Sequence, residues 1–191
     1  MKWSSHIQSV VHRAHQRLGF VKRTLKKAPF KLRKTAYESL VRAQLEYAAI
    51  IWDPVLQGER ESLEKVQKKA ARWARDQYST TASVTALQRD LGWPTLSDRR
   101  RNQRLVLMYK ILHNLIAVPP DLVGIQRATR PARHPRNQDN LQRPRASFKS
   151  SPLWNCTVYR TIPEWNDLPA TIAEADSLSA FKSRIAAAIQ P

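Results

Sequence analysis

An apolar stripe with the period of an α-helix, close to the start of the chain, constrains the fold more than any other feature. Between residues 7 and 25, apolar side chains recur at steps of three and four, which places them on one face of a helix. Ser5 and Gln8 have the spacing of a capping box at its start, and Pro29 is expected to end it. The stripe consists of Ile7, Val10, Val11, Ala14, Leu18, Val21 and Leu25. This segment is therefore predicted to fold as an amphipathic helix and not to trail as a basic tail.

The same period continues along the chain. It predicts a second helix over residues 32–48, stopped by the Trp-Asp-Pro sequence that follows, and a third over 63–74 that starts after Gly58. A shorter helix over 84–91 is expected to end at Gly92, a residue suited to a left-handed cap. Together these segments predict a helical bundle.

The next helix is expected to be the central one. Thr95 and Asp98 form a plausible cap pair at its start, and residues 105–115 are apolar on nearly all sides, which is typical of a buried helix. Near the C-terminus, residues 161–172 predict a short helix with turns, and Ser177 is expected to cap a terminal helix. A weak strand signal lies at residues 153–159.

Composition changes sharply at residues 127–145, which contain six arginines, three prolines and one acid. Prolines break helices, and no apolar period survives here, so an exposed loop or linker is expected. The predicted fold class is mainly α. A helical domain over 1–126 precedes a basic Arg/Pro-rich loop over 127–150, and a helical tail over 151–191 packs back on the bundle.

The charge balance indicates the class of partner. The chain of 191 residues has 33 lysines and arginines against 15 acids, a formal net charge of +18. Between Met1 and Ala43 the only carboxylate is Glu38, against eleven basic residues. Self-repulsion of this size opposes compaction, so it favours a polyanionic partner such as DNA, RNA or an anionic membrane surface.

Membrane and secretory classes receive no support from the sequence. It contains no uninterrupted run of about 18 apolar residues, so no membrane span is expected. Nucleic acid, and not a membrane, is the expected partner. The N-terminal residues have no apolar core followed by a small-residue cleavage site, although their amphipathic, Arg-bearing helix leaves a mitochondrial presequence as a less favoured alternative. Cys156 is the single cysteine, which fits a reducing intracellular compartment, nuclear or cytoplasmic.

Catalytic patterns are not found. Two-metal enzymes hold their ions with clustered carboxylates, and this chain has no adjacent pair of acids and no Gly-rich phosphate loop. His12 and His15 have a spacing that can hold a metal, but no cysteine or carboxylate nearby completes a ligand set. Cys156 has no recognisable histidine partner and is interpreted as structural. We therefore expect no catalytic residue, no metal and no cofactor in this polypeptide.

The basic residues of the first two predicted helices are the main candidates for nucleic-acid binding. They fall away from the apolar stripes, and the two helices meet at a turn, so they could present one continuous positive face. Contacts of lysine and arginine with phosphates give affinity without sequence readout. An ordinary solvated face is the alternative, although such faces usually mix both signs of charge. The candidates are Arg13, Arg17, Lys22, Arg23, Lys26, Lys27, Lys31, Arg33 and Lys34.

Three consecutive arginines, Arg99 to Arg101, begin the predicted central helix. Positive charge in a first turn opposes the helix dipole, so each is expected to have either an acidic partner in the fold or a phosphate. Asp98 and Asp90 are the nearest acids in sequence.

The Arg/Pro-rich loop could lie along a nucleic-acid backbone and become ordered on binding, or serve only as a linker. The residues that would make these contacts are Arg130, Arg133 and Arg136.

The tryptophans could be base-stacking platforms, but most lie at helix ends or on apolar stripes. At least four of the six are therefore expected in the core. They are Trp3, Trp52, Trp73, Trp93, Trp154 and Trp165.

Six ordered sequence blocks resemble the region downstream of the polymerase palm in jockey-like non-LTR (LINE-type) retrotransposon reverse transcriptases. The resemblance covers nearly the whole chain, with one departure at Ala43, where the family pattern has proline. The blocks are KWSSHIQSVVHRAHQRLGFVKRTL, AYESLVRAQLEYAAIIWDP, LEKVQKKAARW, LGWPTLSDRR with LMYKILHN, RTIPEWNDLP and SLSAFKSRI.

The resemblance implies a thumb-like helical bundle and tail that grips template–primer duplex beside a catalytic centre carried elsewhere. The fingers and palm, with their metal-binding aspartates, precede this region in such enzymes and are not part of this sequence. The implied partners are RNA–DNA hybrid, RNA or DNA, together with the palm-bearing part of a reverse transcriptase. A scaffold for protein interaction, or a decayed relic without selected activity, is the alternative.

Overall fold

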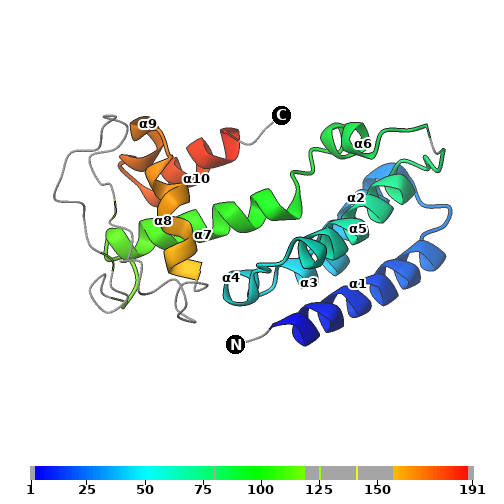
Figure 1. Cartoon of the computed structure of the whole chain (residues 1–191). Coiled ribbons are helices and arrows are strands. Elements are labelled where there is room, and N and C mark those ends of the chain that lie inside the picture. Colours follow the sequence, from blue (N-terminus) through cyan, green and yellow to red (C-terminus); the bar gives the residue numbers. More distant parts are fainter. Residues whose placement is uncertain (1–2, 80, 119–124, 126–140, 142–156, 189–191) are drawn as a thin grey trace. The chain divides into compact units, whose positions relative to one another are not determined.

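The computed structural model describes residues 3–79, 81–118, 125, 141 and 157–188, which are mainly helical, as the periodicity predicted (Figure 1). Backbone contacts divide the chain into two compact units, Met1–Arg100 and Arg101–Gln190. The division falls inside α7 (Leu96–Leu112) and not at the predicted boundary between residues 126 and 127. Almost all of the predicted loop at 127–150 lies outside the described residues.

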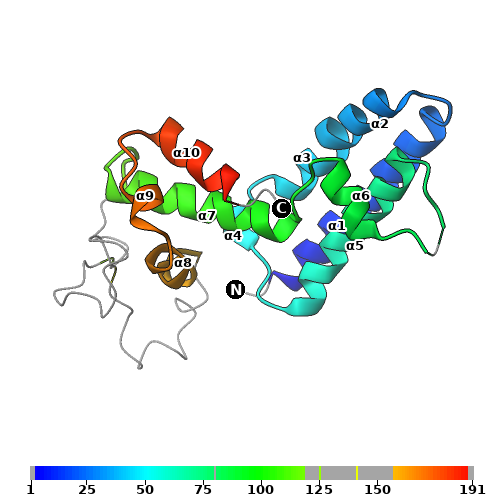
Figure 2. The ribbon, with the colours of Figure 1, turned by 90° about the horizontal axis from the view of Figure 1, so that it is seen from above.

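The first unit is built from three rods. Figures 1 and 2 show that α1 and α5 run in the same direction, with the rod formed by α2, η1 and α3 packed against both in the opposite direction. A short helix, α6, packs against α5. The elements are α1 (Ser4–Thr24), α2 (Phe30–Ala36), the π-helical segment η1 (Tyr37–Arg42), α3 (Ala43–Glu46), α4 (Ala49–Trp52), α5 (Gln57–Ala74) and α6 (Val84–Asp90).

The predicted apolar stripe of α1 forms part of the core, but both predicted ends of this helix are wrong. Trp3 is the N-cap residue, and Ser5 and Gln8 lie inside the helix, where no side-chain cap bond forms. Trp3 packs against the core, and this apolar burial outweighs the roughly 1 kcal/mol that a hydroxyl cap contributes. The helix ends at Thr24, and Pro29 instead begins α2 as its N-cap.

The second predicted helix is interrupted twice. The π-helical turns of η1 change the side chains that face the core, so Tyr37, Val41 and Leu45 are buried while Leu40 is exposed. The helix then breaks at Ala48, which has a left-handed φ of 50°. The indole N–H of Trp52 donates to the carbonyl of Tyr47 at 3.0 Å, which satisfies a backbone acceptor that the break releases.

Buried polar groups join the rods of the first unit. The hydroxyl of Tyr37 donates to Oε1 of Gln67 at 3.1 Å, and Nε2 of Gln67 donates to the carbonyl of Pro94 at 2.9 Å. Burial raises the pKa of the Tyr37 hydroxyl. The two hydrogen bonds of Gln67 tie η1, α5 and the segment before α7 together.

Gly92, just after α6, has the expected left-handed conformation, with a φ of 65°.

The second unit packs the C-terminal helices on the later part of α7. Its core joins Leu105, Tyr109, Trp165 and Phe181, and the hydroxyl of Tyr109 donates to the carbonyl of Ala175 at 2.7 Å. The helices are α8 (Thr157–Asn166), α9 (Ala170–Ala173) and α10 (Leu178–Ala187). The tail therefore packs against α7 as a helical layer.

Two local predictions for this region have different outcomes. Ser177 caps α10 as expected, since its hydroxyl accepts from the N–H of Ala180 at 3.1 Å. The strand signal is wrong for 157–159, which begin α8, and residues 153–156 lie outside the described residues.

The expectation that at least four tryptophans belong to the core is confirmed, and Trp154 lies outside the described residues. The four buried ones are Trp52, Trp73, Trp93 and Trp165.

Candidate nucleic-acid interface

In the described part of the first unit, the carboxylates that form ion pairs do so with arginines and not with lysines. Basic residues outnumber acids by more than two to one over residues 1–100. Among the residues that the structure describes, no lysine of this unit lies within 4 Å of a carboxylate. The pairs are Arg33–Asp76, Arg42–Glu38, Arg75–Asp90, Arg99–Glu46 and Arg100–Asp53. The positive charge that remains for a partner is therefore carried mostly by lysine.

Arg99 and Arg100 have acidic partners in the fold, so the structure resolves the alternative left open by the sequence. Nη2 of Arg99 donates to Glu46 at 3.0 Å, and this bonding raises the pKa of the guanidinium. Nε of Arg100 donates to Asp53 at 2.9 Å, and its side chain is 2% exposed. The prediction that Arg100 contacts nucleic acid is wrong, because burial removes it from any surface. Arg101 is half-buried and begins the second unit.

The two acids expected to pair with these arginines lie elsewhere. Asp98 accepts the hydroxyl hydrogen of Thr95 at 2.6 Å, and its N–H donates to Thr95 Oγ1 at 3.0 Å, as the predicted cap pair requires. Asp90 forms its ion pair with Arg75. Nearness in sequence did not identify the partners, because the fold brings Glu46 and Asp53 to the start of α7 from much earlier in the chain.

Arg33 also has a structural role. Its side chain is 11% exposed and donates to the carbonyls of Lys26 at 2.8 Å and Trp73 at 3.1 Å. It therefore joins the turn after α1 to the end of α5. Of the predicted residues in the first two helices, these remain at least partly exposed: Arg13, Arg17, Lys22, Arg23, Lys26, Lys27, Lys31 and Lys34.

These residues do not share one side of α1. Lys22 lies five positions after Arg17, which corresponds to about 140° around the helix axis. Nη1 of Arg17 donates to the carbonyl of Leu40 in η1 at 3.4 Å, whereas Nζ of Lys22 lies 5.6 Å from the ring centre of Tyr78, just beyond α5. The basic residues of α1 thus divide between a side toward η1 and a side toward α5.

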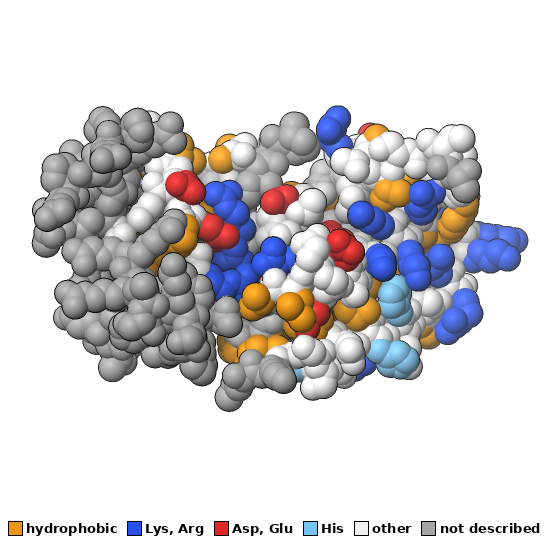
Figure 3. All heavy atoms as spheres, in the orientation of Figure 1, with side chains coloured by type: hydrophobic (Ala, Val, Ile, Leu, Met, Phe, Trp, Pro, Cys, Tyr) orange, Lys and Arg blue, Asp and Glu red, His pale blue; other side chains and the backbone are white. Residues whose placement is uncertain are grey.

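A basic surface extends across α1 and α5, and we call it the α1–α5 face. Burial lowers the pKa of His15, and the nearby positive charges of Lys69 and His12 lower it further, so His15 and Lys69 approach one another across the two helices. Figure 3 shows lysine and arginine side chains gathered over this region, with histidines among them. The face consists of His15 and Lys22 of α1 and of Lys69 of α5. It also includes Lys65 and Arg72, which lie four residues before and three after Lys69 and so share its side of α5.

The three α5 residues of this face were missed as candidates by sequence reasoning. The signal was present as an acid-free run from Lys65 to Arg75 with basic residues at helical spacing. The preceding acid on this helix, Glu64, lies on another side of α5, where burial raises its pKa and Oε1 accepts from the N–H of Ser97 at 2.9 Å. From Lys65 to Arg72 the α1–α5 face therefore contains no carboxylate of α5; Glu59 and Glu61 lie nearer the start of that helix.

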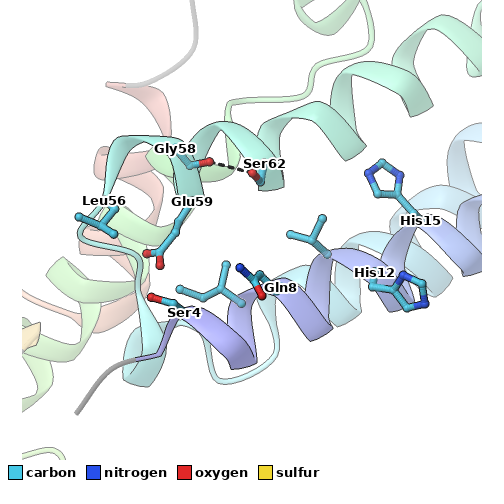
Figure 4. A pocket seen from close by; sticks show the side chains of 10 residues that line it. Ser4, Gln8, His12, His15, Leu56, Gly58, Glu59 and Ser62 are labelled. Atoms are coloured by element: carbon cyan, nitrogen blue, oxygen red, sulfur yellow. Dashed lines mark hydrogen bonds between the residues drawn. The ribbon is translucent and has the colours of Figure 1, made fainter.

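A groove of about 630 Å³ lies between the N-terminal parts of α1 and α5 (Figure 4). It meets the α1–α5 face at His15, which belongs to both. An added Cβ at Gly58 would meet no atom within 4 Å, so this position opens to free space. The lining consists of Ser4, Ile7, Gln8, Val11, His12, His15, Leu56, Gly58, Glu59 and Ser62.

Within the described part of the chain, no group of three or more His, Cys, Asp or Glu side chains could hold a metal ion. Among these residues, His12 and His15 have no third ligand of the kind that a protein zinc site requires. No helix in the described ranges has both the length and the apolar character needed to cross a membrane.

Comparisons with protein-family profiles, with curated proteins and with solved structures give no match.

Proposed function

We propose that this chain is a nucleic-acid-binding module without catalytic activity of its own, which contacts the phosphates of a duplex through the α1–α5 face. The observation that supports this most directly is the separation of roles between the basic residues. Arginines such as Arg100 are used inside the fold, whereas Lys22, Lys65 and Lys69 are left without carboxylate partners among the described residues.

Lysine suits this role physically. Its ammonium group is a compact, strongly hydrated charge on a flexible stem, so it can follow phosphates without imposing the planar geometry of a guanidinium. Contacts of this kind set affinity and orientation but read no sequence. Two parallel helices that carry such residues along their exposed sides are suited to a regular, extended backbone.

The resemblance to the thumb and tail of non-LTR retrotransposon reverse transcriptases gives the proposal a more specific form. In that form, the module grips template–primer duplex, and a separate palm-bearing part supplies the metal-binding aspartates. The module should then show no polymerase activity alone and should increase the processivity of the palm-bearing part when the two are mixed.

A protein-interaction scaffold is a second candidate, and exposed apolar side chains favour it. Tyr47 is 80% exposed and Ile51 is 66% exposed, in the short segments around α4. Leu40 and Val55 are also exposed in this part of the chain. Apolar side chains of this size on one segment are typical of surfaces that another protein covers.

Fluorescence anisotropy with an RNA–DNA hybrid, duplex DNA and single-stranded RNA across a salt series tests the first candidate. If four to six phosphates are contacted, the logarithm of the binding constant should fall with the logarithm of salt concentration with a slope of roughly −3.5 to −5.5. A preference for the hybrid would support thumb-like binding. Equal, weak binding to all three that disappears near physiological salt would contradict the proposal and favour the scaffold.

A further inference from the structure

The groove between α1 and α5 has a chemistry different from that of the basic face that it adjoins. Ile7, Val11 and Leu56 give it apolar side chains, and Leu56 is 60% exposed although it is a large aliphatic residue. A volume of about 630 Å³ falls within the range of roughly 300–1,000 Å³ that small-molecule sites occupy. The groove is therefore large enough to hold a small, partly apolar group.

Polar groups surround this apolar surface. Ser4 and Gln8 come from α1, and Figure 4 shows them on the same side of the groove, across from Gly58 and Ser62 of α5. The hydroxyl of Ser62 donates to the carbonyl of Gly58 at 2.8 Å, so its oxygen remains available as an acceptor. The amide of Gln8 supplies both donors and acceptors. Such a mixture suits a heterocycle with hydrogen-bonding edges.

The two ends of the groove differ in charge. Glu59 lies at one end and would repel a phosphate there, while its carboxylate can accept from the amino or imino groups of a base. At the other end, His15 lies close to Lys69 of the basic face, where phosphates are favoured. A strand that follows the face would thus place its phosphates over the lysines and its terminal bases in the groove.

We propose that the groove binds one or two unpaired bases at the end of a strand whose phosphates lie on the α1–α5 face. The module would accordingly prefer a duplex with a short single-stranded overhang to a blunt duplex. This inference rests on the proposed function, since the basic face supplies the phosphate contacts. The lowered pKa of His15 fits the geometry, because a neutral imidazole can contact a base as donor and acceptor.

Two variants separate the groove from the basic face. Gly58→Trp adds a large side chain at a position that lines the groove, and an added Cβ there meets no atom within 4 Å, so the substitution should obstruct the groove without a backbone clash. Gly58→Ala is the matched control that leaves the groove open. Leu56→Asp is a second, independent variant: Leu56 is the N-cap residue of α5, where aspartate is favoured, and the substitution removes an apolar side chain from the groove.

The experiment measures affinity for a blunt RNA–DNA hybrid, for the same hybrid with a short overhang, and for a hybrid whose overhang is abasic. The wild-type chain should bind the base-bearing overhang about tenfold more tightly than the other two. Gly58→Trp and Leu56→Asp should remove this difference and leave affinity for the blunt hybrid within about twofold, whereas Gly58→Ala should retain it. Circular dichroism and thermal unfolding verify that each variant is folded.

The outcomes distinguish the two proposals. Equal wild-type affinity for all three hybrids, with a steep salt dependence, would overturn the base-binding groove and leave the phosphate-binding face intact. Equal affinity for abasic and base-bearing overhangs would also overturn it, since the gain would then come from extra phosphates alone. Failure to bind the blunt hybrid at all would contradict the proposed function itself.

Discussion

Arg100 and Asp53 form an ion pair that is almost completely removed from water. Nε of Arg100 donates to Oδ1 of Asp53 at 2.9 Å, and the two side chains are 2% and 3% exposed. Arg100 is the fifth residue of α7, and its positive charge is buried there. The carboxylate of Asp53, which follows α4, compensates for the cost of that burial. Arg100, which the sequence places among candidate surface residues, thus has a structural role inside the fold.

Replacing Asp53 with asparagine should destabilise the chain strongly. The substitution removes the negative charge that forms an ion pair with the buried guanidinium of Arg100, and breaking a buried ion pair typically costs about 3–5 kcal/mol. Urea denaturation followed by circular dichroism measures the loss in the free energy of unfolding. The double variant Asp53→Leu with Arg100→Met is the control, because it removes both charges and should recover much of the loss. Equal stability of Asp53→Asn and the wild type would contradict the structural role.

Replacing Lys65 and Lys69 with glutamate reverses two charges of the α1–α5 face and should weaken binding to duplex nucleic acid. Each phosphate contact that is lost reduces the magnitude of the salt slope by about 0.9, so the double variant should bind with a slope smaller by about two. Anisotropy titrations at several salt concentrations measure both effects.

Arg13→Glu with Arg17→Glu is the matched control for the lysine pair. It makes the same change in net charge on the side of α1 that faces η1. If the control variant loses as much affinity as the lysine variant, then total charge, and not the α1–α5 face, governs binding.

Lowering the pH should destabilise the folded chain through His15. Its pKa is lowered in the folded state by burial and by Lys69 of α5 and His12 of α1, so the unfolded chain binds the proton more readily. Stability should therefore be highest above the unfolded pKa of about 6.5 and decline as the pH falls through and below that value.

Thermal unfolding between about pH 8 and pH 5 measures this dependence. His15→Gln should flatten the decline relative to the wild type. An equal decline in both proteins would assign it to other groups.

Replacing Tyr37 with phenylalanine should lower the free energy of unfolding by about 1–3 kcal/mol, since Oε1 of buried Gln67 loses its donor. Chemical denaturation measures the change. Tyr47→Phe is the matched control, because Tyr47 is largely exposed and should tolerate the loss of its hydroxyl. Similar values for the two variants would show that the buried hydrogen bond contributes little.

Ser177→Ala should destabilise the chain by about 1 kcal/mol, because the cap bond from the N–H of Ala180 is lost. Ser5→Ala should leave stability unchanged or slightly improved, since Ser5 lies inside α1, where alanine is the better helix former. Thermal unfolding of the two variants side by side tests the assignment. A loss for Ser5→Ala as large as that for Ser177→Ala would indicate that Ser5 caps α1 after all.

Helix content, the buried stripe of α1 and several local caps could be predicted because they depend on residues close together in the chain. A three- to four-residue period places Ile7, Val10 and Ala14 on one face whatever else the chain does. The left-handed conformation at Gly92, which favours glycine, and the capping bond of Ser177 also depend only on nearby residues. The sequence also determined the excess of positive charge, and with it the class of partner that we propose.

Tertiary structure alone decided which charges remain available. The partners of Arg99 and Arg100 are 53 and 47 residues away in sequence, so only packing could show that these arginines are used inside the fold. The same holds for the π-helical turns of η1 and for the approach of Lys69 to His15 between α5 and α1. Propensity and period act within a turn or two of helix, whereas the choice of ion-pair partners and exposed faces depends on how separate helices pack together.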